Sequence, residues 1–379
     1  MKTFLFTFFI IFSFNCYSQS TLSEDSFISL ITCRPGDEIF NSWGHTGVRV
    51  NDPSKNMDIV FNYGMFSFEE PNFLMKFLRG KLLYWVGLER FDRFYAKYDH
   101  EKRTVIEQKL NLTQEEKNKI FDALNDNLKK ENQQYLYDFF FDNCSTRPRD
   151  KILSNLEVTS DLDKKTDVTF RHLLDPYIRH QTWTDFGIDL IVGSIADVKS
   201  TTSEQMFLPE LLQKNFSSIN LKDKALVESE TIILNHENAV TTRTKPSLIK
   251  PIYIFLILLF IELWLFIKRK NWDNKWVKNY DKIWFTLVGI CSILIAFMWF
   301  GTNHISTKAN LNLLWLNPIF FGLHFSNKTY LKIACLTALI LTLIISPFFQ
   351  ELHTVSIIII CLLILKLSRL LKNTTVANA

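Results

Sequence analysis

Near its N-terminus the chain reads Ser42-Trp43-Gly44-His45-Thr46-Gly47-Val48-Arg49-Val50, in which a histidine follows a glycine at the head of a strand-forming run. Short apolar runs rich in β-branched and aromatic residues predict strands here and on either side, at Phe27–Thr32, Gly47–Val50 and Ile59–Tyr63. The pattern therefore predicts a sheet that presents His45 at the point where one strand begins.

A cysteine at the start of a helix forms the second motif, Asp142-Asn143-Cys144-Ser145-Thr146-Arg147. The N–H groups at a helix N-terminus and a nearby imidazole both favour a thiolate, so we expect a lowered pKa for this thiol. Cys144 and His45 would then act as nucleophile and general base, with backbone N–H groups stabilising an oxyanion. Asn62, on the strand after His45, is placed to orient the imidazole.

Simpler interpretations of these residues remain open at this point. A histidine beside a glycine is usually a turn or core residue, and Cys33 and Cys144 are enough for one disulfide. The sequence has no phosphate-binding glycine loop and no spacing typical of a metal site. We therefore expect no bound metal and no cofactor. A net charge of only +4, without a basic run in the polar part, argues against nucleic acid as a partner.

The N-terminus has the features of an export signal. A positive start precedes an apolar run, Thr3–Phe14, and the small residues around Ser18 predict cleavage after it. A lipobox at Cys16 is the alternative. We therefore expect a signal peptide at 1–18 and a periplasmic domain with its linker at 19–250.

The last third of the chain has the composition of a membrane domain. Between Pro251 and Leu371, 15 of 121 residues are charged, against 67 of the other 258. This part holds five apolar stretches, of which the third is short for a span and is compatible with a re-entrant or interfacial segment. The stretches are Pro251–Ile267, Ile283–Gly301, Leu311–Phe325, Leu331–Phe349 and Leu352–Leu371.

Basic residues predict how these spans are oriented. They concentrate in the first and third connectors and in the tail, whereas the alternate connectors hold only Lys308. Because basic loops stay on the cytoplasmic side, the tail at 372–379 is expected in the cytoplasm and the N-terminal domain in the periplasm. The sequence thus predicts a multi-pass protein of a bacterial inner membrane, with an all-α transmembrane domain of about five spans at 251–371.

Several motifs together resemble the Bacteroidota family of lipoprotein N-acyltransferases, the Lnb-like proteins. Besides Gly44-His45-Thr46 and Asp142–Arg147, they are Leu30-Ile31-Thr32-Cys33-Arg34-Pro35-Gly36-Asp37, Phe61-Asn62-Tyr63-Gly64 and Asn310-Leu311-Asn312-Leu313-Leu314-Trp315-Leu316-Asn317-Pro318. The order of a histidine strand, a polar strand and a cysteine at a helix start also resembles lecithin:retinol acyltransferase-type enzymes. The resemblance implies an α+β periplasmic domain of permuted papain-like fold.

The family resemblance also implies a reaction, in which a phospholipid donates an acyl chain to the α-amino group of a diacylglyceryl-cysteine lipoprotein. By their place in the motifs, Cys144 corresponds to the nucleophile of the family and His45 to its base. Asn62 takes the third polar position, where lecithin:retinol acyltransferases usually have histidine. Thioesters react readily with amines, so a thiol enzyme suits transfer from an ester to an amide.

Weaker candidates for substrate contacts are Asn143, Tyr63, Arg147, His304 and Trp315. Arg147 either binds lipid phosphate or only solvates its helix. His304 lies in a predicted periplasmic connector, where it would meet a headgroup. Glu262, within the first span, is expected to hydrogen-bond another helix.

Two other functions are compatible with the sequence. One is a membrane-tethered papain-like amidase or peptidase acting on cell-wall peptide, which would use the same two residues. The other is a non-enzymatic envelope assembly module closed by a disulfide between Cys33 and Cys144. A bridged Cys144 cannot be a nucleophile, so the state of this thiol separates the module from both enzymes.

Overall fold

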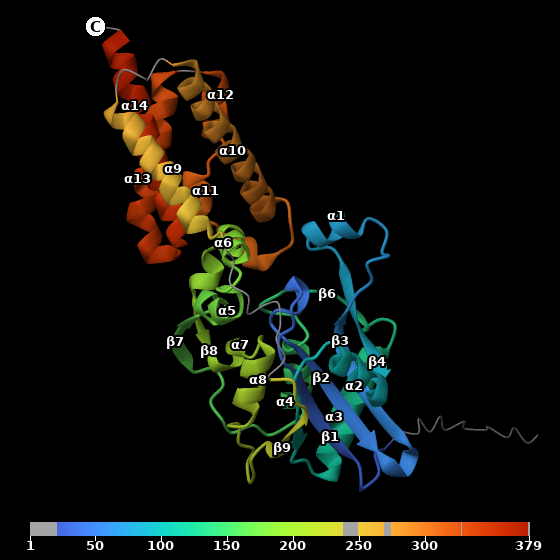
Figure 1. Ribbon diagram of the computed structural model, residues 1–379. Helices are drawn as coiled ribbons and strands as arrows, with labels where there is room; N and C mark the ends of the chain where they lie inside the picture. The colour runs from blue at the N-terminus through green and yellow to red at the C-terminus, as the bar shows by residue number, and fades with distance from the viewer. Residues whose placement is uncertain (1–20, 238–248, 269–273, 327, 378–379) are drawn as a thin grey trace, which may run out of the picture.

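The computed structural model describes residues 21–237, 249–268, 274–326 and 328–377. It contains an N-terminal sheet domain followed by a helical C-terminal domain (Figure 1), which confirms the predicted α+β class. The predicted signal peptide and most of the polar linker before residue 250 lie outside the described residues.

The N-terminal domain is built on an antiparallel sheet of seven strands in the order β6-β4-β3-β2-β1-β5-β9. The three predicted strands are confirmed as the central ones, and β2 begins at His45. Paired residues include Cys33 with His45 and Gly47 with Asn62. The strands are β1 (Phe27–Cys33), β2 (His45–Asp52), β3 (Met57–Met65), β4 (Leu83–Arg90), β5 (Val105–Leu110), β6 (Gln134–Leu136) and β9 (Val227–Leu234).

The two faces of this sheet carry separate apolar cores. Residues such as Val48, Phe61 and Tyr63 point to one face and pack against α3 (Gln114–Leu128), α4 (Thr146–Leu153) and α8 (Pro209–Phe216). The alternate residues, including Cys33 and Val60, point to the other face and pack against α2 (Phe91–His100). This alternation follows from the two-residue period of a strand.

A smaller lobe lies between the sheet and the membrane domain (Figure 1). It contains α5 (Phe170–Ile178), α6 (Thr182–Ile191), α7 (Thr202–Gln205) and the two-stranded pair β7 (Lys165–Thr169) and β8 (Lys199–Thr201). Its core consists of aromatic and aliphatic side chains, among them Phe140, Phe170 and Phe207. Short helical turns complete the domain at η1 (Ile39–Asn41), η2 (Pro53–Lys55) and η3 (Ser194–Asp197), together with α1 (Phe73–Leu78).

Within the described part of the chain, three C-terminal helices are long and apolar enough to cross a membrane. They are α10 (Lys275–Phe300), α13 (Thr329–Phe349) and α14 (Thr354–Ala377), the last counted over Thr354–Lys372. A fourth, α9 (Pro251–Ile267), is apolar but shorter. The expected third span is not one helix, because it consists of α11 (Asn312–Trp315) and α12 (Ile319–Phe325). Pro318 cannot donate a backbone hydrogen bond, which accounts for the break. The membrane character is thus confirmed, whereas the five-span count is not.

Four buried charged side chains hold three of these helices together. Lys366 Nζ lies 2.8 Å from Glu262 Oε2 and 2.7 Å from Asp281 Oδ1. Arg369 contacts the same two carboxylates at 2.9 and 2.6 Å. These residues come from α9, α10 and α14, so Glu262 does bond another helix, and it does so through ion pairs.

Asparagine side chains join the membrane domain to the lobe that contains α6. Asn310 Nδ2 donates to the carbonyl oxygens of Leu190 and Ile191 at 2.8 and 2.9 Å. Asn312 Nδ2 donates to the Asp189 carbonyl at 3.1 Å, and its Oδ1 accepts from Trp315 Nε1 at 2.8 Å. Carbonyl groups at a helix C-terminus have no partner within the helix, so these amides provide one for α6.

Candidate functional site

The turn before α4 fixes the position of Cys144. Asn143 Oδ1 accepts hydrogen bonds from the backbone N–H groups of Ser145 and Thr146 at 2.7 and 3.0 Å. Its Nδ2 donates to the carbonyls of Phe139 and Phe207 at 2.8 and 2.9 Å. The Asn143 side chain is therefore fully bonded within the protein and shapes the turn that presents the thiol.

The Cys144 side chain reaches the ends of β2 and β3. Its thiol interacts with the backbone N–H of Thr46, the residue after His45, and with the Tyr137 hydroxyl. On the next strand, a Cβ added to Gly64 would lie 3.3 Å from the Cys144 Cβ, and Gly64 has a φ of +84°. Both the positive φ and the close approach favour glycine at this position.

Burial controls the electrostatics of the thiol. Desolvation raises the pKa of Cys144, and the hydrogen bonds from Thr46, Tyr137 and Ser145 lower it without cancelling the rise. The expected lowering of this pKa is therefore wrong, because desolvation outweighs the hydrogen bonds to the thiol. A thiol with a raised pKa is predominantly neutral near pH 7.

The imidazole of His45 is held by a chain of two hydrogen bonds. Its Nε2 lies 2.8 Å from Asn62 Oδ1, and Asn62 Nδ2 donates to Glu89 Oε2 at 3.1 Å. A carboxylate can only accept, so Glu89 fixes which end of the Asn62 amide faces His45. Because Oδ1 is an acceptor, Nε2 of a neutral imidazole must carry the proton, which leaves Nδ1 as the basic nitrogen.

The surroundings of His45 disfavour its charged form. Burial lowers the pKa of His45 to about 3, and the positive charges of Lys97 and Arg103 act in the same direction. The hydrogen bond to Asn62 opposes this shift without reversing it. His45 is consequently neutral near pH 7, and it is available as a base.

The structure brings His45 and Cys144 to the same end of β2. Among the described residues, the hydrogen bonds of these side chains run to different partners, and none joins the imidazole to the thiol. The Thr46 hydroxyl, 3.0 Å from the Ser145 hydroxyl, ties this end of the strand to the start of α4. A proton transfer between the two groups therefore needs a small movement or a bridging substrate atom.

Cys33 and Cys144 are both free thiols and face different cores of the sheet. Cys33 is fully buried, and desolvation raises its pKa to about 12. It pairs with His45 across the strands and lies in the core beside Tyr98. The structure thus contains no bond of the kind that the disulfide-closed module requires between these cysteines.

Comparison with protein families gives two matches. Residues 14–176 match the Lnb N-terminal periplasmic domain, and residues 243–375 match the Lnb transmembrane domain. The chain belongs to the Lnb-like family. Comparisons with curated proteins and with solved structures gave no significant match.

These matches agree with the arrangement of the chain, because a periplasmic domain precedes apolar helices. This Lnb-like chain is therefore a membrane protein with a periplasmic domain. The first match contains His45, Asn62 and Cys144, and the second contains the Asn310–Pro318 motif that receives the end of α6.

Three of the weaker site candidates are occupied by contacts inside this Lnb-like protein. Tyr63 is buried and donates to Asn127 Oδ1 at 3.0 Å. Arg147 pairs with Asp142 at 2.6 Å and lies over the Tyr135 ring at 3.5 Å. Trp315 is buried in the membrane domain. Their roles in substrate binding stay predictions, as does that of Asn143.

His304 lies at a different place from the thiol. Its Nε2 is 3.0 Å from the Phe77 carbonyl oxygen, and the preceding Asn303 N–H donates to the Arg79 carbonyl at 2.9 Å. The connector after α10 thus contacts α1 of the periplasmic domain. A headgroup contact by His304 stays a prediction.

Sequence reasoning missed Glu89 and Tyr137. Glu89 lies on β4, which pairs with β3 so that Gly87 stands opposite Asn62 and Glu89 stands opposite Val60. Only this pairing brings Glu89 within hydrogen-bond distance of Asn62. Tyr137 reaches the thiol from the segment after β6, and its ring lies 4.5 Å from that of Tyr84. Neither residue belongs to a sequence motif, so identifying them requires knowledge of how the strands pair.

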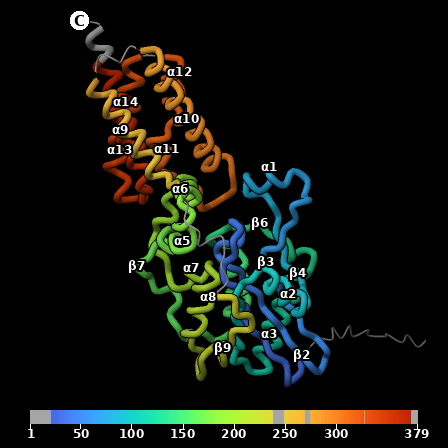
Figure 2. The backbone as a smooth tube through the Cα atoms, in the orientation of Figure 1, coloured from blue at the N-terminus to red at the C-terminus, as the bar shows by residue number. Residues whose placement is uncertain are grey.

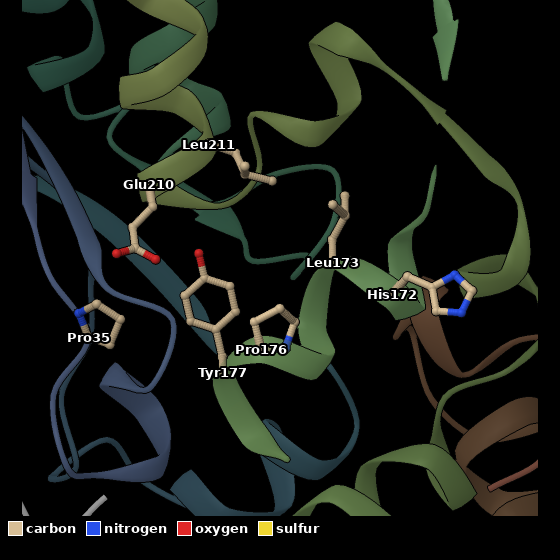
Figure 3. Close-up of a pocket in the computed structure, with 7 residues that line it drawn as sticks. All are labelled: Pro35, His172, Leu173, Pro176, Tyr177, Glu210 and Leu211. Atoms are coloured by element: carbon tan, nitrogen blue, oxygen red, sulfur yellow. The ribbon is translucent and has the colours of Figure 1, made fainter. Parts of the chain in front are cut away.

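A cavity of about 370 Å³ lies between α5, α8 and the segment after β1 (Figure 3). Its lining includes Glu210, which is paired with Arg34, and His172, which contacts Glu351 at 3.0 Å. None of the predicted site residues lines it. We therefore place the candidate site at Cys144 and not in this cavity.

Proposed function

We propose that this protein is a thiol acyltransferase that moves a fatty acyl chain from a phospholipid to the α-amino group of a diacylglyceryl-cysteine lipoprotein. The observation that carries the proposal is the placement of a tautomer-fixed imidazole and a thiol at one end of β2, in a chain of the Lnb-like family. The membrane domain supports an apolar donor, which can approach from the bilayer.

In the first half-reaction, Cys144 Sγ attacks the carbonyl carbon of the phospholipid ester. Nδ1 of His45 accepts the thiol proton, and the proton passes to the glycerol oxygen as the carbon–oxygen bond breaks. The products are a lysophospholipid and a thioester on Cys144. Because both groups rest in their neutral forms, the proton moves during the attack and not before it.

In the second half-reaction, the acceptor amine attacks the thioester carbon. His45 accepts a proton from the amine, the carbon–sulfur bond breaks, and the proton returns to the Cys144 thiolate. The product is an amide on the lipoprotein N-terminus. The Tyr137 hydroxyl, which already contacts the thiol, is the side-chain donor proposed for the oxyanion in both steps.

The test is to incubate the purified full-length protein with phospholipid alone. We expect the Cys144 peptide to gain the mass of one acyl group, which neutral hydroxylamine removes and a diacylglyceryl peptide with a free N-terminus discharges. Cys33→Ala is the matched control, since this free thiol faces the other core, and it should keep the adduct. Peptide cleavage without an acyl adduct would support an amidase instead.

A further inference from the structure

The segment between β3 and β4 exposes an unusual amount of apolar surface. We call residues 66–82 the β3–β4 hairpin; it includes α1 and projects beyond the sheet (Figure 1). The exposed fractions are 66% for Phe68, 66% for Leu74, 56% for Met75 and 46% for Phe77. An apolar cluster of this kind on a folded protein marks a surface that contacts another apolar phase or partner.

The hairpin is an ordered unit with its own packing. The Phe66 ring lies 4.9 Å from the Phe68 ring, 6.0 Å from Phe73 and 5.3 Å from Tyr84. Gly80, with a φ of +62°, returns the chain towards β4. The rings support one another, while Leu74 and Met75 remain outside this cluster and face solvent.

The place of the hairpin is set by the membrane domain. The backbone of Asn303 and the imidazole of His304 bond the carbonyls of Arg79 and Phe77, at 2.9 and 3.0 Å. Residues 303 and 304 come just after α10, which ends at Phe300 and is long enough to cross a membrane. Figures 1 and 2 both show α1 beside this connector. The hairpin therefore lies at the level where a membrane-spanning helix leaves the bilayer.

The charges of the hairpin fit the same surface. Arg79 and Lys81 are exposed at its base, Glu69 is exposed near its start, and Lys76 pairs with Glu70 at 2.6 Å, so three cations and two carboxylates leave the hairpin with a net charge of +1. An element with apolar side chains at its tip and basic residues behind them is suited to an interfacial position. The apolar groups enter the acyl region, and the cations remain at the phosphates.

We propose that the β3–β4 hairpin inserts Leu74, Met75 and Phe77 into the periplasmic leaflet of the bilayer that the membrane domain spans. The partner is a phospholipid surface, and continuity with the α10 connector is the reason for choosing it over a second protein. This contact goes beyond acyl transfer, because it requires no reaction at Cys144.

The insertion has a consequence for the thiol. From the hairpin, ring contacts continue from Phe66 to Tyr84 at 5.3 Å and from Tyr84 to Tyr137 at 4.5 Å. Tyr137 contacts the Cys144 thiol. A row of rings thus leads from the inserted tip to the candidate nucleophile, and it offers an acyl chain an apolar path out of the leaflet.

The test is photo-crosslinking in the full-length protein, reconstituted into vesicles of phosphatidylethanolamine and phosphatidylglycerol. A benzophenone amino acid replaces Leu74 in one variant and Leu88 in the control. Leu88 is 51% exposed and lies further along β4, away from the hairpin. Both variants carry Cys144→Ala, so the result does not depend on catalysis.

We expect the peptide with the probe at position 74 to gain the mass of a phospholipid. Its crosslinking yield should be at least about tenfold above that of the probe at position 88. Equal yields at both positions would overturn the proposal, and so would crosslinking of the Leu74 probe to a second copy of the protein in place of lipid. An acyl adduct at Cys144 in the wild-type protein tests the proposed function separately, so the two failures are distinguishable.

Discussion

Asn62 donates from Nδ2 to Glu89 Oε2 at 3.1 Å while its Oδ1 lies 2.8 Å from His45 Nε2. The carboxylate therefore sets the orientation of the amide, and the amide sets the tautomer of the imidazole. Glu89 acts on the proposed base through Asn62 and is a positioning residue. It is half-buried on β4, whereas His45 stands at the start of β2.

This relationship predicts different results for two substitutions at Glu89. Glu89→Gln keeps an acceptor oxygen for Asn62 Nδ2 and should retain most of the acyl-transfer rate. Glu89→Leu frees the amide to flip, so kcat should fall about tenfold to a hundredfold, as for lost outer-shell hydrogen bonds elsewhere. Measuring kcat for both at several pH values checks this. Equal losses in the two variants would mean that Glu89 serves only to support the strand.

Cys144 and His45 should behave as one unit in a double-mutant cycle. Cys144→Ser keeps the size of the side chain but not its nucleophilicity, so activity should fall by about a thousandfold or more. His45→Ala should be almost as damaging, and the double variant no worse than the more damaging single change. Additive losses in the steady-state rate would show that the two residues act in separate steps.

The lowered pKa of His45 gives a pH prediction with a definite sign. Its pKa falls from an ordinary 6.5 to about 3 on folding, so the folded state binds the proton less well than the unfolded state. The stability that this group contributes is complete above pH 6.5 and is lost as the pH falls towards 3. In thermal melts, His45→Gln should therefore flatten the fall in stability over this range.

Activity should follow the same group. With His45 as the base, kcat/KM measured as a function of pH should not fall as the pH drops through 6.5, the pH at which an ordinary histidine is half protonated. An acid limb centred near 6.5 would contradict the lowered pKa and place the base in a more exposed setting.

The sequence was sufficient for the parts of the site that depend on local pattern. The strand that begins at His45 and the helix that follows Cys144 are as expected, since β-branched runs and a helix start are local signals. The Glu89 contact depends on the register between β3 and β4, which includes an irregularity after Asn62 and has no local signature. The predicted direction of the Cys144 pKa shift was wrong, because burial raises this pKa more than the nearby N–H groups lower it. Burial is a property of the packed domain and not of the local sequence.

In the membrane domain, too, local patterns predict some features and contacts within the folded chain decide others. Apolar stretches locate the helices α9, α10, α13 and α14. The third stretch is broken, because Asn317 Oδ1 accepts from the Ile319 N–H at 3.1 Å and starts a new helix beyond Pro318. Hydropathy alone does not record such a restart.

The membrane domain should depend for its stability on the balanced buried charges of four residues, Glu262, Asp281, Lys366 and Arg369. All four are almost completely buried, and each cation contacts both carboxylates. Removing one partner leaves an uncompensated charge in an apolar setting, which typically costs about 3–5 kcal/mol. Lys366→Met should therefore lower the thermal midpoint of the detergent-solubilised protein strongly.

A second change should restore much of this loss. Lys366→Met combined with Glu262→Gln removes one charge of each sign, so the remaining Asp281 and Arg369 can still pair, at 2.6 Å in the structure. Lys275→Met, at the exposed start of α10, is the control and should change little. If the double variant is no more stable than Lys366→Met alone, charge balance is not what the cluster contributes, and its hydrogen bonds to each helix must account for the stability instead.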